Sequence, residues 1–140
     1  MTPTHVGAQI VDAAVFRVLV EMETRKAQRM RYVVSLVSLG AEDGASAAAL
    51  AQRVAPAIRA TDAVTTQTGD SVTMLLVDAE DTNLPTIMER LTPGLDDVRW
   101  SAGGSCYPKT AATADELLNQ AERMREQARR QGGRRLSLPS

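Results

Sequence analysis

The chain has 140 residues, 44% of them hydrophobic and 24% charged, which fits one globular domain with a single core. Its formal net charge of −1 excludes a strong overall attraction to nucleic acid or membrane, and an aromatic fraction of 3% excludes extended base-stacking surfaces. One cysteine excludes an intrachain disulfide and favours a cytoplasmic location, while no apolar run approaches the ~20 residues that a membrane-spanning helix needs.

The N-terminal part of the chain predicts a flexible segment and then a helix. Residues 1–9 carry no periodic pattern, so we expect them to be mobile and the single domain to extend over residues 10–138. Apolar residues recur at helical spacing between Ile10 and Arg31, which predicts the first helix. Its expected core-facing residues are Val11, Val15, Val18 and Met22.

A buried strand and a second helix are predicted next. Residues 32–39 form an almost continuous apolar run, which is typical of a strand covered on both faces. Residues 46–59 are rich in alanine and predict a helix with Leu50, Val54 and Ile58 facing inward. Pro56 should loosen the last turn of this helix because its ring cannot fit a regular helix interior.

The centre of the sequence predicts a β-hairpin. Residues 62–67 are rich in valine and threonine, and residues 72–77 are β-branched and apolar. Between them Gly69 can adopt a positive φ and form the turn. The second strand is apolar on both faces, which predicts a central position in a covered sheet.

The C-terminal half predicts a helix, a strand, a long helix and a short edge strand. Asn83 can cap a helix over residues 84–91, and residues 98–107 predict a strand. Thr113 to Glu116 form a capping box that opens the last helix, and residues 136–138 can add an edge strand. This order of elements predicts an α+β fold with a mixed or antiparallel sheet covered by helices.

The hairpin and the elements around it resemble the GGDEF domain of diguanylate cyclases. The family's signature turn is Gly-Gly-Asp/Glu-Glu-Phe, and the vestigial turn here consists of Thr68, Gly69, Asp70, Ser71 and Val72. Weaker motifs follow in the family's order over residues 12–136, among them Glu23 to Arg29, Gly104 to Pro108 and Glu116 to Leu118. The resemblance implies the family's palm-like sheet with a ferredoxin-like core.

The resemblance also implies catalytic metal ions held by acids, and this sequence lacks two of those acids. The family's first-strand acid is best matched by Ser38, with Ser35 a poorer match, and its second hairpin acid is matched by Ser71. Only Asp70 remains, and a lone carboxylate holds Mg²⁺ weakly. The family's guanine-reading loop is shortened to residues 40–44. We therefore predict no catalytic residue, metal site or cofactor, and a degenerate GGDEF-like pseudo-enzyme.

A second family site is retained. Arg59 and Asp62 stand before the turn at the spacing of the family's inhibitory site, which binds cyclic di-GMP, and Arg90 matches an arginine that family members often add. An arginine can pair bidentately with guanine O6 and N7, and an aspartate can accept from guanine N1 and N2. The alternative is that Arg59 is a solvated cation at a helix end and that Asp62 only opens a strand.

The sequence therefore predicts an inactive signalling module that serves as a cyclic di-GMP receptor. The first alternative is a protein-interaction or dimerisation scaffold without ligand, and a residual diguanylate cyclase is the second. A protein partner or homodimer is expected, and nucleic acid and membrane are not. The C-terminal arginines predict a solvated helix face, with a docking surface for an acidic partner as the alternative; they are Arg123, Arg125, Arg129 and Arg130.

Overall fold

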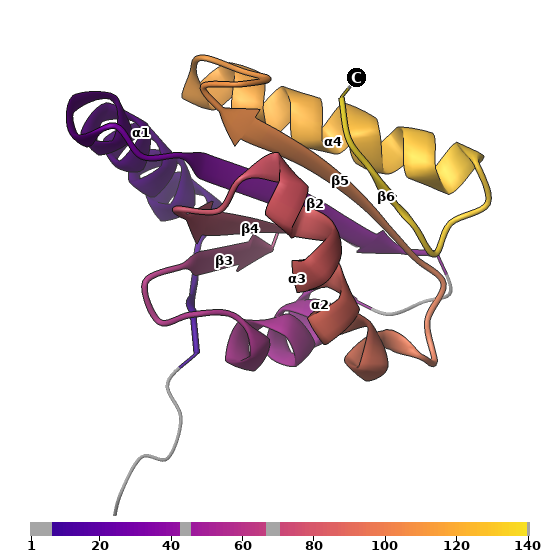
Figure 1. Ribbon diagram of the computed structural model, residues 1–140. Helices are drawn as coiled ribbons and strands as arrows, with labels where there is room; N and C mark the ends of the chain where they lie inside the picture. The colour runs from indigo at the N-terminus through magenta and orange to yellow at the C-terminus, as the bar shows by residue number, and fades with distance from the viewer. Residues whose placement is uncertain (1–6, 43–45, 67–70, 140) are drawn as a thin grey trace, which may run out of the picture.

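A six-stranded sheet with helices on both faces forms the molecule (Figure 1). The computed structural model describes residues 7–42, 46–66 and 71–139. The strands are β1 (Gln9–Val11), β2 (Val34–Ala41), β3 (Ala63–Thr66), β4 (Ser71–Val77), β5 (Trp100–Tyr107) and β6 (Leu136–Ser137). The helices are α1 (Ala13–Met30), α2 (Ala47–Val54), α3 (Leu84–Leu91) and α4 (Ala114–Arg130), with short 3-10 turns at Ala55–Ala57, Asp81–Asn83 and Thr92–Leu95.

The sheet is mixed, with the strand order β1-β3-β4-β2-β5-β6. The four inner strands pair antiparallel, whereas the short edge strands β1 and β6 run parallel to β3 and β5. This arrangement confirms the predicted α+β fold with a helix-covered mixed sheet. It also confirms the hairpin, since Thr66 of β3 pairs with Val72 of β4. The turn residues Thr68, Gly69 and Asp70 lie outside the described residues.

Strands β2 and β4 lie side by side at the centre of the sheet, as their sequences predict. All eight residues of β2 are buried, and so are the first six of β4. Leu36 and Leu75 face each other across the pair, as do Ser35 and Leu76. A strand covered on both faces has no solvated side, and for this reason its sequence is apolar at successive positions.

Two hydrophobic clusters fill the space between the sheet and its helices. Helices α2 and α3 cover one face, and their cluster includes Leu50, Leu76 and Leu84. Helices α1 and α4 cover the other face, where Leu75 and Leu117 belong to the second cluster. Figure 1 shows the two helix pairs on opposite sides of the strands.

The core-facing side of α1 differs from the prediction. Phe16 and Val20 are buried against the sheet, together with Thr24 and Ala27. Three of the four predicted residues are directed outward instead: Val15, Val18 and Met22 are 45%, 51% and 52% exposed. The fourth, Val11, lies in β1 rather than in the helix and packs against the core. The helix carries an apolar row on both sides, and helical periodicity alone cannot decide which row packs.

Two element starts also differ from the prediction. Ala8 donates its backbone N–H to the Ala55 carbonyl, and Gln9 begins β1, so these two residues are part of the fold rather than of a mobile segment. Helix α1 then begins at Ala13, with Asp12 accepting from the Val15 N–H as its N-cap. A three-residue edge strand carries too short a pattern to be read beside a long helical one.

The ends of two further helices are set by local chemistry. Helix α2 ends at Val54 and continues as a 3-10 turn that contains Pro56, in agreement with the loosened last turn. Asn83 does not cap α3 with its side chain; it accepts from the Glu80 N–H at 2.9 Å and caps the preceding 3-10 turn. Among the described residues, no helix is long and apolar enough to cross a bilayer.

Candidate functional site

The three residues predicted to bind ligand line one cavity. Arg59 follows α2, Asp62 immediately precedes β3, and Arg90 lies at the end of α3; the three meet around a space of about 230 Å³. Its apolar wall includes Ile58, Leu76 and Ile87. The fold thus brings together residues that are up to 31 positions apart in the sequence.

Asp62 is buried and holds the backbone around it. Its Oδ2 accepts from the Arg59 N–H at 3.2 Å, and its Oδ1 accepts from the Val77 N–H at 2.9 Å. Only 5% of the residue is exposed. The carboxylate therefore ties the segment after α2 to the end of β4. In the alternative interpretation Asp62 only begins a strand, whereas here it also holds two distant backbone segments together.

One edge of the Arg59 guanidinium is bonded to the protein, and the other edge is exposed to solvent. Its Nη2 donates to the Val77 carbonyl, and its Nε lies 3.6 Å from Asp62 Oδ2. The side chain is nevertheless 57% exposed, so the rest of the guanidinium faces solvent above the cavity. These two contacts fix the plane of the guanidinium, which reduces the entropy lost when a planar partner binds.

Arg90 supplies a second cation to the same cavity. It is exposed on the last turn of α3, and no hydrogen bond or ion pair joins it to another residue of the described chain. Asp78 contributes an acid to the lining. Two guanidinium groups beside an apolar wall can bind a planar, acceptor-rich base and its phosphate. The prediction that Asp62 accepts from guanine itself stays a prediction.

On the opposite face of the sheet, buried hydroxyl groups replace the expected acids. Ser38 and Ser71 stand where the resemblance places metal-binding carboxylates, and both are buried. Thr73 and Ser101 lie on the neighbouring strands, opposite Ser38 and Gly40. At these four positions on the strands, the described end of the sheet below α4 therefore carries hydroxyl side chains.

Arg125 of α4 reaches this hydroxyl-lined end of the sheet. Its Nε donates to Ser38 Oγ at 2.9 Å, and the side chain is only partly exposed. The prediction of a fully solvated arginine face is wrong for this residue. A weak signal for it exists in the sequence, because a buried serine hydroxyl usually needs a hydrogen-bond partner, and a long polar side chain of the covering helix can supply one.

The hydroxyl-lined end does not fit a divalent cation. Hard cations such as Mg²⁺ prefer carboxylate and carbonyl oxygens, whereas Ser38 and Ser71 offer neutral hydroxyls. Arg125 adds a positive charge beside them, which repels a metal ion. Within the described part of the chain, no group of three or more His, Cys, Asp or Glu residues could hold a metal.

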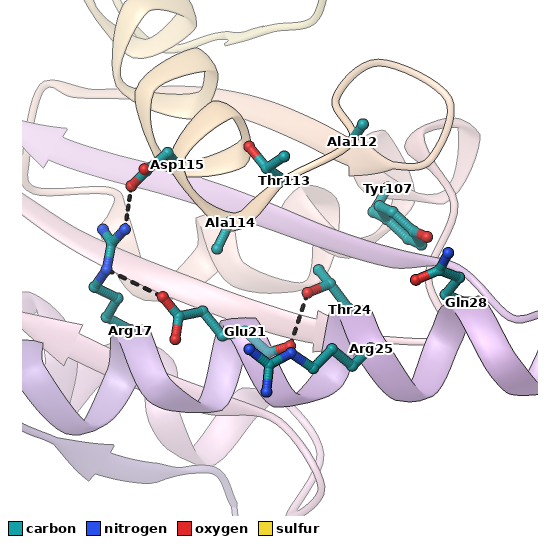
Figure 2. A pocket seen from close by; sticks show the side chains of 10 residues that line it. All are labelled: Arg17, Glu21, Thr24, Arg25, Gln28, Tyr107, Ala112, Thr113, Ala114 and Asp115. Atoms are coloured by element: carbon teal, nitrogen blue, oxygen red, sulfur yellow. Dashed lines mark hydrogen bonds and ion pairs between the residues drawn. The ribbon is translucent and has the colours of Figure 1, made fainter.

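Another cavity lies between α1 and the start of α4, and it contains none of the predicted site residues. Its volume is about 330 Å³. Figure 2 shows Arg17 bridging Glu21 and Asp115 across its mouth, with Thr24 bonded back to the Glu21 carbonyl. Asp115 raises the pKa of the Arg17 guanidinium through this bond. These contacts join the two helices, and the ion pair at the mouth is exposed and contributes little to stability.

Comparison with known proteins gives a fold but no sequence relative. The sequence matches no protein-family model and no curated protein. Among solved structures, the GGDEF domain of PA1120 (YfiN or TpbB) from Pseudomonas aeruginosa has a TM-score of 0.85 at 17% identity, covering 93% of this chain and 96% of that one. The active GGEEF domain of a diguanylate cyclase from Vibrio cholerae has a TM-score of 0.80 at 12% identity, covering 91% and 96%.

A third similar structure concerns a novel interaction mode between a microbial GGDEF domain and bis-(3,5)-cyclic di-GMP. It has a TM-score of 0.73 at 18% identity, covering 92% of this chain and 91% of that one. At such identities the similarity concerns the fold alone. The expected palm-like α+β architecture is confirmed.

Proposed function

We propose that this chain, which has the GGDEF fold, is a catalytically inactive signalling module that binds cyclic di-GMP through Arg59, Asp62 and Arg90. The observation that carries the proposal is the meeting of these three residues around one cavity. The likeness to a GGDEF domain whose structure concerns cyclic di-GMP supports this choice of ligand. The cavity of about 230 Å³ is below the ~300–1,000 Å³ typical of small-molecule sites, so it takes one guanine base while the rest of the ligand lies over the exposed arginines.

The proposed roles differ among the three residues. Arg59 presents its solvent-facing N–H groups to the guanine acceptors, and Arg90 pairs with a phosphate or a second acceptor. Asp62 keeps the backbone of Arg59 in place through its two backbone hydrogen bonds. Removing Asp62 would disturb the loop itself, so Arg59 is the better residue for a binding test.

Loss of catalysis is the second part of the proposal. Joining two GTP molecules needs metal ions that clamp the attacking and leaving oxygens. Ser38 and Ser71 cannot provide the charge that holds those ions, and the Arg125 guanidinium lies against Ser38. We infer that the chain retains the GGDEF architecture for recognition rather than for chemistry.

Purified protein incubated with GTP and either Mg²⁺ or Mn²⁺ is expected to form no cyclic di-GMP. The physical reason is the replacement of metal-binding acids by Ser38 and Ser71. Product is measured by chromatography after long incubation at high protein concentration. Formation of product that disappears in the Asp70→Ala variant would contradict the proposed inactivity, since contaminating enzyme would not respond to that change.

Arg59→Ala is expected to weaken cyclic di-GMP binding by about ten- to hundredfold, because one charge-assisted bidentate contact is worth ~1–3 kcal/mol. Arg59→Lys should restore little affinity, since an ammonium group cannot form the planar fork. Calorimetry measures both. The matched control is Arg123→Ala, which removes an exposed arginine of α4 on the other side of the sheet and should leave affinity unchanged.

The outcome that contradicts receptor function is equally definite. If folded wild-type protein gives no heat with cyclic di-GMP at tens of micromolar, the receptor proposal is withdrawn. The same holds if Arg59→Ala and Arg123→Ala bind equally well. Thermal melts of each variant are needed, because Arg59 also contacts the Val77 carbonyl and Asp62.

A protein-interaction or dimerisation scaffold is the second candidate, and one observation favours it. The outward row on α1 exposes Val15, Val18 and Met22 at spacings of three and four residues. An apolar stripe of this kind is typical of a helix that packs against a partner helix. This candidate replaces the first if no ligand binds.

We propose that residues 10–138 form one degenerate GGDEF-like domain and that it acts in the cytoplasm, where a single buried cysteine stays reduced. The expected partners are cyclic di-GMP and a protein or a second copy of the chain, without nucleic acid.

A further inference from the structure

A cavity of about 320 Å³ lies where α1 ends and β2 begins, beside the end of β5. Its wall is mainly apolar and includes Val33 and Pro108. It shares no residue with the Arg59 cavity, and no acidic side chain is among the described residues that line it. Its volume is at the lower end of the ~300–1,000 Å³ typical of small-molecule sites, so it suits a ligand with a single ring system.

Both tyrosines of the chain line this cavity. Tyr32 and Tyr107 are half-buried, and each packs on one side against the hydrophobic cluster below α1 and α4. The other aromatic residues of the chain, Phe16 and Trp100, are buried. Most of the aromatic surface that a ligand can reach is therefore gathered here. Tyrosine offers a planar ligand a large and rigid contact surface.

The Tyr32 ring is held in place by a hydrogen bond. Its hydroxyl donates to Glu23 Oε2 at 2.6 Å, and Lys26 Nζ lies 3.3 Å from the other oxygen of that carboxylate. Burial and the bond to Glu23 raise the pKa of Tyr32 to about 12, so the hydroxyl keeps its proton and its bond at neutral pH. A ring that is already fixed loses little entropy when a ligand packs against it.

Arg31 is the cation among the described residues that line the cavity. It ends α1 with φ 60° and ψ 50°, a left-handed conformation that favours glycine because a Cβ is crowded there. Arg29 already places a positive charge in the last turn of the helix, so the helix dipole does not require Arg31. An arginine kept against the preference of the backbone indicates a role for its side chain.

The Arg31 guanidinium is available to a ligand. The side chain is exposed, and no hydrogen bond or ion pair joins it to another residue of the described chain. Its five N–H donors form a planar fork that matches the two oxygens of a carboxylate. A positive charge beside an aromatic, apolar wall without acids is complementary to an anion that carries a ring.

We propose that this cavity binds a small aromatic carboxylate. The ring of the ligand packs against Tyr32 and Tyr107, and its carboxylate accepts from the Arg31 fork. Gln28 and Tyr107 also line the neighbouring cavity between α1 and the start of α4 (Figure 2), so a polar substituent on the ring can extend toward their side chains. The site does not depend on cyclic di-GMP binding at Arg59.

The test titrates three acids into the full chain: 3-phenylpropionate, 4-hydroxyphenylacetate and indole-3-acetate. The uncharged match of the first is 3-phenylpropanamide. Calorimetry should give a dissociation constant of about 1 mM or lower for at least one acid, as expected for ligands of about 11 to 13 non-hydrogen atoms. The amide should bind about tenfold more weakly than its acid, because it lacks the charge that the guanidinium recognises.

Arg31→Gln should abolish the preference for the acid and leave binding of the amide unchanged, since only the charged contact is lost. The matched control is Arg29→Gln, which removes an exposed cation of α1 that does not line the cavity and should keep the preference. Tyr107→Leu replaces an aromatic wall by an aliphatic one and should weaken acid and amide alike, by about tenfold.

Arg31→Gly separates a binding role from a structural one. Glycine suits a φ of 60° better than arginine does, so this variant should melt at the wild-type temperature or higher while it loses the preference for the acid. A lower melting temperature would show that the arginine side chain supports the fold, and the proposal would be withdrawn. Four other results would overturn it: no acid bound by folded wild-type protein, equal affinity for acid and amide, an unchanged preference in both Arg31 variants, or full affinity in Tyr107→Leu.

Discussion

Replacing Leu75 or Leu76 by alanine is expected to lower the free energy of unfolding by ~2–5 kcal/mol in each case. The two leucines are neighbours on β4 and point to opposite faces of the sheet, where they are 2% and 1% exposed. Leu75 packs in the cluster below α1 and α4, and Leu76 packs in the cluster below α2 and α3. Each substitution leaves a cavity that a central strand cannot collapse, and urea denaturation measures the loss.

Met22→Ala is the control for this pair. Met22 is also a large apolar residue, but it is 52% exposed on the outward row of α1, so its truncation should change the free energy of unfolding by no more than ~0.5 kcal/mol. Near-neutral results for both leucines would mean that β4 is not the covered inner strand that the sheet order requires. A large loss for Met22→Ala would mean that its row is buried in solution, as a scaffold or dimer would bury it.

Gly103→Ala is expected to be at least as severe, with a loss of ~3 kcal/mol or more in the free energy of unfolding. The added Cβ would overlap three backbone atoms of α4, namely the nitrogen of Arg125, the carbonyl oxygen of Ala121 and the carbonyl carbon of Met124. A side chain could rotate away from such a contact, but a helix backbone cannot. The helix must then move away from β5, which would open the packing of Leu117 and Ala121.

Gly94→Ala is the matched control, and its expected effect has the opposite sign. A Cβ at Gly94 would meet no atom within 4 Å, so the substitution mainly reduces the entropy of the unfolded chain. The change should be neutral or stabilising by about 0.4–1 kcal/mol. Thermal and urea unfolding of both variants distinguish the cases. Equal stability of the two variants would show that α4 does not lie against Gly103 as described.

The candidate site could be predicted only in part. The Arg59 and Asp62 pair was visible as a spacing before a hairpin, and the helix that follows the hairpin indicated Arg90. The detailed role of Asp62 was not visible, because it depends on the Val77 N–H, which β4 brings to it from 15 residues away. Long-range backbone partners of this kind leave no periodic trace in the sequence.

The sequence by itself determined the order of most elements. The apolar runs of β2 and β4, the hairpin between β3 and β4, and the Thr113 N-cap of α4 are local signals, and each depends only on residues within a few positions of one another. The predicted capping box is only half formed, because the Glu116 carboxylate accepts from the Ala112 N–H rather than from Thr113. The central place of β4 was also local, because a strand that is apolar on both faces must be covered on both.

Only the tertiary structure decided which side of α1 packs and where Arg125 lies. Both rows of α1 have helical period, and Phe16 and Val20 are buried because the surface that Leu36 and Leu117 form lies on their side. Arg125 is partly buried because α4 crosses the sheet above Ser38, 87 residues earlier in the chain. Such choices follow from contacts between distant segments, and a pattern within one segment cannot contain them.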